Sequence, residues 1–253
     1  MSADQVLSCG RILATLPAKS TDSETVEAAM RLNAYRELVV REQGLYGLSE
    51  EGSLFVATNP TISTGMLWVA AQTAYSATAV NFHIQNTDVI GGKSARLKSL
   101  KLIATAAATS TTAVHYAVSL DPVARTLSTD NTAAITPKNC NGGVSNTCPI
   151  LVNAQNSASV SALSAASPGN RILARGCMGG LNIIGEEFVL NFGVQMGGAM
   201  TPTAVDAAGQ PGRRCNSAPA IIVPPGASCS IHIWSPAAAA SMAPEFELLF
   251  AVK

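Results

Sequence analysis

The chain is 253 residues long, with 47% hydrophobic and only 13% charged residues, and its 16 basic side chains balance 16 acidic ones. Because it carries no net positive charge and no dense run of Lys and Arg, we expect no binding to nucleic-acid phosphates. No apolar stretch approaches the roughly 18 consecutive residues of a membrane span, and residues 1–6 lack the positively charged start of a secretory signal. The composition indicates a protein that works in aqueous solution, without membrane contact.

The low content of charged residues also predicts which side chains cover the surface. The charged share of a typical chain is about 25%, so Ser, Thr, Asn, Gln, Ala and Gly must cover much of this protein. Such side chains leave water at a small cost compared with an unpaired Lys or Glu. This composition is typical of a subunit that packs against neighbours, and it predicts an assembly protein.

The first 43 residues are predicted to be an interaction segment. Residues 1–20 have no core of their own and form an arm of the kind that orders on a partner. Asp22 or Ser23 can cap a helix that runs to about Gln43, since acidic residues in its first turn suit the helix dipole. Gly44 ends this helix. We therefore expect one α-helix in the chain and a domain boundary after Gln43.

Residues 44–253 show the pattern of an antiparallel β domain. Short apolar or alternating runs are separated by Gly, Pro, Asn and Asp, without the intervening helices that a parallel sheet needs. Eleven strands are predicted, more than the eight of a jelly roll, so we expect a mainly β, jelly-roll β-sandwich with additional strands. The predicted strands span residues 53–58, 65–70, 79–86, 94–106, 115–120, 133–136, 171–177, 187–192, 220–223, 228–234 and 245–252.

Alternation also predicts which side chains face the core. In residues 80–86 the apolar side chains occupy every second position, so they are predicted to be buried. The polar side chains between them, Asn81, His83 and Gln85, are predicted to face outward. Residues 223–226, Val-Pro-Pro-Gly, are predicted to form a hairpin turn, because Pro cannot donate to a strand ladder.

Two segments and one cysteine pair allow more than one interpretation. Residues 104–113 and 152–168 are rich in Ala, Ser and Thr, and the second is either a short helix or a long loop laid on a neighbouring subunit.

The six cysteines stand singly, without metal-ligand spacing, so we expect no zinc site. Cys140 and Cys148 flank a turn-rich segment; they either form a disulfide or stay free, which a reducing cytosol favours.

Signatures of catalysis are sought among the histidines and the Gly-rich segments. His83 and His232 lie at outward positions of alternating strands and His115 begins another strand, so all three are expected to be surface or interface histidines. Residues 91–94, Gly-Gly-Lys-Ser, mimic the end of a phosphate loop, but Thr87 replaces the glycine that the motif needs. We expect a hairpin turn there.

Carboxylates and aromatic residues give no catalytic pattern either. The adjacent Glu pairs at 50–51 and 186–187 point to opposite sides of a strand and cannot share a substrate. Aromatic residues make up only 5% of the chain, which argues against a sugar-binding platform, and Trp68 and Trp234 are expected to anchor the core or an interface. We expect no enzyme activity, no small-molecule substrate, and no catalytic, cofactor-binding or metal-binding residue.

Several segments of the β domain resemble virion-associated proteins encoded in tailed-phage genomes. They are GSLFVATNPT at residues 52–61, GGK at 91–93, LKSLKLIATA at 97–106, HYAVSLD at 115–121 and VPPG at 223–226. These segments form the fold and carry no catalytic signature. The resemblance implies a structural role in a virion, with head cement or decoration proteins of jelly-roll type nearest in character, and it transfers no functional residue.

The leading hypothesis is therefore a capsid cement or decoration protein, assembled in the host cytoplasm and bound to the major capsid protein at the virion surface. Segment 1–43 is expected to reach a neighbour, and a homo-oligomer, preferably a trimer, is expected. The alternative is a tail, baseplate or fibre component that binds a neighbouring tail protein or a host surface through residues 137–170. A third class, a cell-encoded binding module or carbohydrate enzyme, would need a concave site with clustered aromatic residues or carboxylates.

Overall fold

The computed structural model describes residues 45–70, 73–106, 114–157, 159–179, 184–193, 213–235 and 240–253. The chain divides into two compact units, Met1–Gly47 and Leu48–Lys253. Only residues 45–47 of the first unit are described, so the predicted arm and the predicted helix up to Gln43 lie outside the described residues. The two large sheets belong to the second unit.

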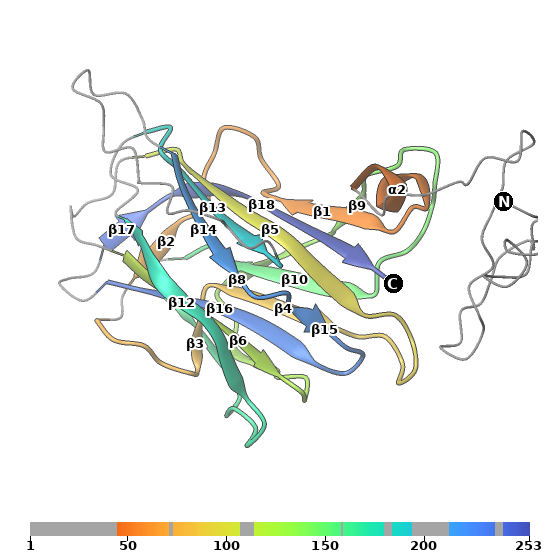
Figure 1. Ribbon diagram of the computed structural model, residues 1–253. Helices are drawn as coiled ribbons and strands as arrows, with labels where there is room; N and C mark the ends of the chain where they lie inside the picture. Colours follow the sequence, from red (N-terminus) through yellow and green to blue (C-terminus); the bar gives the residue numbers. More distant parts are fainter. Residues whose placement is uncertain are drawn as a thin grey trace, which may run out of the picture. The chain divides into compact units, whose positions relative to one another are not determined.

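The described residues form one short helix and eighteen strands (Figure 1). The helix is α2 (Leu45–Glu50). The strands are β1 (Leu54–Thr58), β2 (Trp68–Ala70), β3 (Ala79–Val80), β4 (Phe82–Asn86), β5 (Ala95–Ala104), β6 (Val114–Asp121), β7 (Leu127–Thr129), β8 (Thr132–Ile135), β9 (Lys138–Asn139), β10 (Ile150–Gln155), β11 (Ser161–Leu163), β12 (Arg171–Gly179), β13 (Glu187–Phe192), β14 (Arg213–Ala218), β15 (Ile222–Val223), β16 (Ser228–Trp234), β17 (Ala240–Met242) and β18 (Pro244–Val252).

Two large sheets pack face to face and appear as the upper and lower layers of Figure 1. The first sheet has the order β14-β13-β5-β18-β1-β9, with β15 also paired to β5, and the second has the order β12-β6-β16-β4-β10-β8. All neighbours in these sheets are antiparallel except β13 and β14, which are parallel. Two smaller sheets, β3-β11-β7 and β17-β2, complete the described structure.

Eight strands define the topology. Along the chain, β1, β4, β5, β6, β12, β13, β16 and β18 are the first to the eighth of them. With the eight strands numbered in this way, the first sheet contains the order 6-3-8-1 and the second sheet contains the order 5-4-7-2. This is the strand arrangement of a jelly roll. The predicted fold class, a mainly β antiparallel jelly-roll sandwich with additional strands, is confirmed.

The core lies between the two sheets and is built from the inward side chains of both. Phe82 makes edge-to-face contacts with Trp68 and Phe246, with ring centroids 4.7 and 4.9 Å apart, and all three residues are buried. Ile84 is buried beside them, as alternation predicts. Trp68 is therefore a core anchor, as expected from the sequence.

Strand β5 changes phase at Lys98. Leu97 faces inward before this point and Leu100 faces inward after it, so the inward positions change from odd to even numbers. The register with β18 shifts at the same place, between Leu249 and Phe250. One extra residue in a ladder is a β-bulge, which re-aims the side chains that follow it. As a result, Lys101 faces outward.

All eleven predicted strand regions contain a strand, but the prediction for residues 152–168 was wrong. It proposed a short helix or a loop, whereas β10 ends in this segment, at Gln155, and β11 lies within it. The inward residues of β10 are Ile150, Val152 and Ala154, and the strand pairs with β4 on one side and β8 on the other. The alternation begins at Ile150, before the Ala- and Ser-rich part that dominated the prediction.

Two local predictions also need correction. The β domain was expected to begin at residue 44 without a helix and with its first strand at residue 53. The helix α2 precedes this strand, and its Leu48 packs on Leu54 and Ala251. The turns at residues 91–94 and 223–226 were expected to close hairpins. They instead join strands of different sheets, β4 to β5 and β15 to β16. Such crossings between layers are what a sandwich requires, and turn residues alone do not distinguish them from hairpins.

Candidate interaction surface

The centre of the outer face of the second sheet is covered by the chain itself. Residues 122–170, between β6 and β12, supply β7 and β11, which form a small sheet with β3. The loop at Arg125 lies against the outer side of the large sheet, where this residue is only 2% exposed. Most outward side chains of the central strands β4, β6 and β16 are consequently buried, whereas Leu151 of β10 and Ile172 of β12 are about half exposed.

His83 shows the effect of this cover. It points outward from β4, as predicted, but it is 1% exposed, so the expectation of a surface histidine is wrong. Its Nδ1 lies 3.3 Å from Ser230 Oγ and its Nε2 lies 3.0 Å from the carbonyl oxygen of Arg125. Burial, with a smaller contribution from the positive charge of Arg125, lowers the pKa of His83 to about 4.

His232 is buried in the same way on the neighbouring strand β16. Its Nε2 lies 2.9 Å from Ser119 Oγ, and its Nδ1 contacts the carbonyl oxygen of Ala79. Burial lowers its pKa to about 4 as well. A serine bonded to a histidine is also the pair used in nucleophilic catalysis, but Ser119 and His232 are each 2% exposed. The pair therefore holds β3 on the sheet, and it does not meet a substrate in this arrangement.

Arg125 and Asp121 fasten the rest of the cover. The Arg125 guanidinium donates to the carbonyl oxygen of Ser164, with Nε 3.0 Å away, while its Nη1 has no partner among the described residues. Asp121 accepts hydrogen bonds from Ser167, at 2.9 Å from the backbone nitrogen, and from the backbone of Val123 at 3.0 Å. Burial alone would raise the pKa of Asp121, but these hydrogen bonds outweigh it and lower the pKa.

Within the described residues, the outer face of the first sheet is more open. Toward one end, Leu48 of α2 packs on Leu54 and Ala251, with Leu249 beside them. Beyond this cluster the outward side chains, except the buried Val189, are partly or largely exposed and mix aliphatic, hydroxyl and charged groups. These outward residues are Val56, Thr58, Ser99, Lys101, Ile103, Glu187, Asn191, Glu245 and Glu247.

A hollow of about 240 Å³ lies on this open face, near the end of β1. Glu245 and Glu247 both reach it, because alternate residues of β18 face the same side. Lys101 Nζ bonds Glu187 Oε1 at 3.2 Å, and Glu245 Oε1 is buried without a hydrogen-bond partner among the described residues. The lining residues are Thr58, Asn59, Thr61, Ile62, Lys101, Ile103, Glu245, Phe246 and Glu247.

One rim of the hollow is a tightly held loop, residues 59–65. Asn59 Oδ1 accepts the backbone N–H of Phe246 at 2.6 Å, and its Nδ2 donates to Thr64. A Cβ at Gly65 would stand 2.1 Å from the carbonyl oxygen of Ala243, so only glycine lets the loop approach the residue before β18 this closely. The loop leaves Ile62 88% exposed at the rim.

A second exposed apolar feature is the turn from β4 to β5. Val89 is 74% and Ile90 is 97% exposed at its tip. The turn is nevertheless held in one conformation, since Asp88 accepts from the backbone of Val89 at 2.9 Å and of Lys93 at 2.8 Å. Two aliphatic side chains are thus presented on a rigid support, which lowers the entropy cost of a contact.

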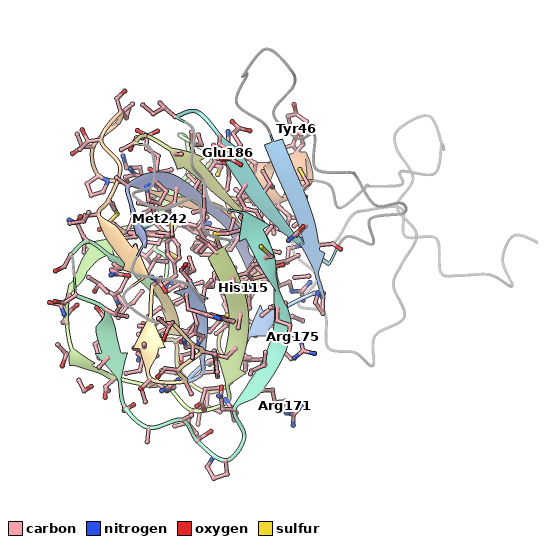
Figure 2. The ribbon with its side chains drawn as sticks, turned by 90° about the vertical axis from the view of Figure 1, so that its left-hand side faces the viewer. Tyr46, His115, Arg171, Arg175, Glu186 and Met242 are labelled. Atoms are coloured by element: carbon pink, nitrogen blue, oxygen red, sulfur yellow. The ribbon has the colours of Figure 1, made fainter. Side chains whose placement is uncertain are left out.

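The remaining candidate residues from the sequence do not join these features. Cys140 and Cys148 are free cysteines. His115 is half-buried and stacks on Trp234 with ring centroids 5.8 Å apart. Figure 2 shows His115 beside the edge strand β12, from which Arg171 and Arg175 extend outward. No group of three metal-ligating side chains occurs within the described residues.

The sequence analysis missed the carboxylates of the hollow. It considered only adjacent Glu pairs, at residues 50–51 and 186–187, which point apart. The signal that was present is the spacing of Glu245 and Glu247 inside a predicted strand, because residues two apart share a face. The rim of residues 59–65 could not be anticipated in the same way, since its position depends on long-range contacts.

No protein-family model, no curated protein and no solved structure matches this chain. Among the described residues, no helix has the length and apolar character needed to cross a bilayer.

Proposed function

We propose that this protein is a non-catalytic structural subunit of a bacteriophage particle, a capsid cement or decoration protein that binds the lattice of the major capsid protein. The observation that carries the proposal is the difference between the two outer faces. The centre of one is covered by β3, β7, β11 and the loop at Arg125, whereas the other leaves mixed aliphatic and polar side chains exposed. An exposed sheet face that mixes aliphatic, hydroxyl and charged side chains suits a protein partner.

The stabilising mechanism in this proposal is burial of the open face. Apolar surface removed from water contributes about 25 cal/mol per Å². The exposed Ile62 at the rim of the hollow supplies such surface, and Val89 and Ile90, on the turn that crosses between the two sheets, supply a further apolar contact. Their supporting loops are fixed by hydrogen bonds before binding, so little conformational freedom is lost. Repetition of this contact around a shell makes many modest interfaces act together.

The experiment that tests the proposal uses phage heads that lack the protein. Purified protein is mixed with these heads, and co-sedimentation is measured together with the temperature at which the heads release DNA. We expect binding and a higher release temperature. Ile62→Asp on the open face should weaken binding, whereas Ile172→Asp, at a residue 50% exposed on β12, serves as the matched control and should bind normally.

The same assay examines segment 1–43 and the oligomer. We propose a trimer in which this segment reaches a neighbouring subunit. A chain that begins at Gly44 is expected to co-sediment less than the full chain, and light scattering of the free protein should give the mass of three chains. Unchanged head binding after the deletion would contradict this assignment of the segment.

A tail, baseplate or fibre component remains the alternative proposal. Its expected contact region, residues 137–170, contains β9, β10 and β11, and part of it is used to cover the second sheet. Less of the region is therefore available as a free loop for a host surface. Binding to tails or host cells, with no binding to heads, would favour this alternative.

A further inference from the structure

We infer that the hollow on the open face receives an arginine side chain of the protein that this chain binds. The inference rests on the proposed function, since it names the contact through which the partner docks. It adds a specific chemical group on the partner and a specific acceptor, Glu245, on this chain.

The charge of the hollow favours a cation. Glu245 and Glu247 line it together with Lys101, but Lys101 is engaged by Glu187 at 3.2 Å. Neither Glu245 nor Glu247 forms a salt bridge within the described residues. A guest with a positive group is therefore attracted, and an anionic guest is repelled.

The unsatisfied oxygen of Glu245 indicates where the donor belongs. Its Oε1 is buried and has no hydrogen-bond partner in the described part of the chain. A buried carboxylate oxygen without a donor is costly, whereas a charge-assisted hydrogen bond to it is strong. A guanidinium presents several N–H groups in a planar fork and suits carboxylates better than an ammonium does.

The size and the apolar part of the hollow fit one long side chain. Its volume of about 240 Å³ is smaller than the roughly 300–1,000 Å³ of pockets that take drug-sized ligands. Ile103 lines the hollow and Ile62 stands exposed at its rim. These residues provide apolar surface for the aliphatic stem of an arginine while its head reaches Glu245.

A direct binding experiment tests the hollow without phage heads. The probe is N-acetyl-arginine methylamide, and the matched uncharged probe is the corresponding citrulline derivative; both are titrated into the full chain and followed by backbone amide NMR shifts. We expect the arginine probe alone to shift residues 58–62 and 245–247. Glu245→Gln should weaken its binding about tenfold, the loss expected for a charge-assisted hydrogen bond.

The control variant is Glu51→Gln, which removes a carboxylate on this chain that bonds Lys253 instead. It should leave probe binding unchanged, and thermal melts should show that both variants fold. Equal shifts with the citrulline probe, or no shift with either probe, would overturn the inference.

Head binding of the same variants tests the identity of the partner. Glu245→Gln should bind heads more weakly than the unmodified chain, whereas Glu51→Gln should bind heads as strongly as the unmodified chain. If the arginine probe binds but Glu245→Gln binds heads normally, the assignment to a partner arginine is wrong. If neither the unmodified chain nor any variant binds heads, the proposed function is wrong. The probe titration then still decides whether the hollow accepts an arginine side chain.

Discussion

At the scale of single residues, the buried polar groups on the second sheet decide how the cover is held. His83, His232 and Arg125 have lost almost all contact with water and have gained hydrogen bonds to Ser230, Ser119 and Ser164. Burying such groups is favourable only when partners are supplied. The two histidines are held in their neutral form, and this has a consequence for acid stability.

We predict a loss of stability between pH 6.5 and pH 4. The pKa values of His83 and His232 are about 4 in the folded chain and 6.5 when exposed, so the unfolded chain binds more protons in this range. The neutral histidines stabilise the fold fully above pH 6.5, and each contributes up to about 3 kcal/mol that is lost as the pH falls to 4. Urea unfolding at pH 7.5, 5.5 and 4.5 measures this loss.

The control for the pH effect is the double variant His83→Gln and His232→Gln. It should show a flatter dependence of the free energy of unfolding on pH over the same range. Equal stability of the unmodified chain at pH 7.5 and pH 4.5 would contradict the description of these two histidines.

Asn86 is predicted to be the most sensitive residue of the β4–β5 turn. Its side chain is fully buried, donates to the carbonyl oxygens of Lys93 at 2.8 Å and Val223 at 3.0 Å, and accepts from Asp88 N at 3.0 Å. Asn86→Ala leaves these groups without partners and should cost about 2–4 kcal/mol of unfolding free energy. Gln85→Ala, on the same strand, should cost less than half as much in the same denaturant melts.

At the scale of elements, alternation in the sequence predicted to which side of the sheet each side chain points, but not whether that side chain is exposed to solvent. It placed Phe82 and Ile84 inward and His83 outward, and all three directions are confirmed. It could not show that His83 is covered, because the cover is Arg125 and its neighbours, far along the chain. The exposure of a side chain depends on which remote segment covers that side of the sheet. The side to which it points depends only on the local period of two along the strand.

The eleven predicted strands were sufficient to predict a jelly roll, but not its crossings or its hollow. Turn residues at 91–94 were recognised, yet the same residues can close a hairpin or cross between sheets. The phase change at Lys98, which turns Lys101 outward, is visible in the spacing of Leu97 and Leu100. The hollow itself requires the rim at residues 59–65 to lie on β18, a contact that no local pattern encodes.

The edge strand β12 is predicted to resist aggregation because of its cations and irregularities. Arg171 and Arg175 are exposed along it (Figure 2), and its pairing with β6 shifts at two places. Charged side chains and bulges on an edge prevent pairing with another chain. The double variant Arg171→Thr and Arg175→Thr should aggregate several-fold faster below its melting temperature, as followed by light scattering.

The control for the edge is Arg96→Thr, an exposed arginine of β5 that lies inside the first sheet. It removes one positive charge without altering an edge and should aggregate at the rate of the unmodified chain. If Arg96→Thr aggregates as fast as the β12 variant, net charge and not edge protection is responsible.

At the scale of the whole described unit, the jelly roll separates two tasks between its faces. The small sheet β3-β11-β7 and the loop at Arg125 cover the centre of one face, where polar groups form internal hydrogen bonds. On the other face Glu245 and Glu247 line a hollow, and Ile62 is exposed at its rim. Glu245 Oε1 has no hydrogen-bond partner among the described residues. A fold arranged in this way supports stable attachment to a partner, which is the role proposed for it in a phage capsid.

The central claim is that the open face is the surface that contacts the capsid. Hydroxyl-radical footprinting of the protein, free and bound to phage heads, measures this directly at each side chain. We predict that oxidation of Ile62 and Leu249 falls on binding while that of Ile172 on β12 is unchanged. Protection of Ile172 without protection of Ile62, or equal oxidation in the two states, would contradict the account.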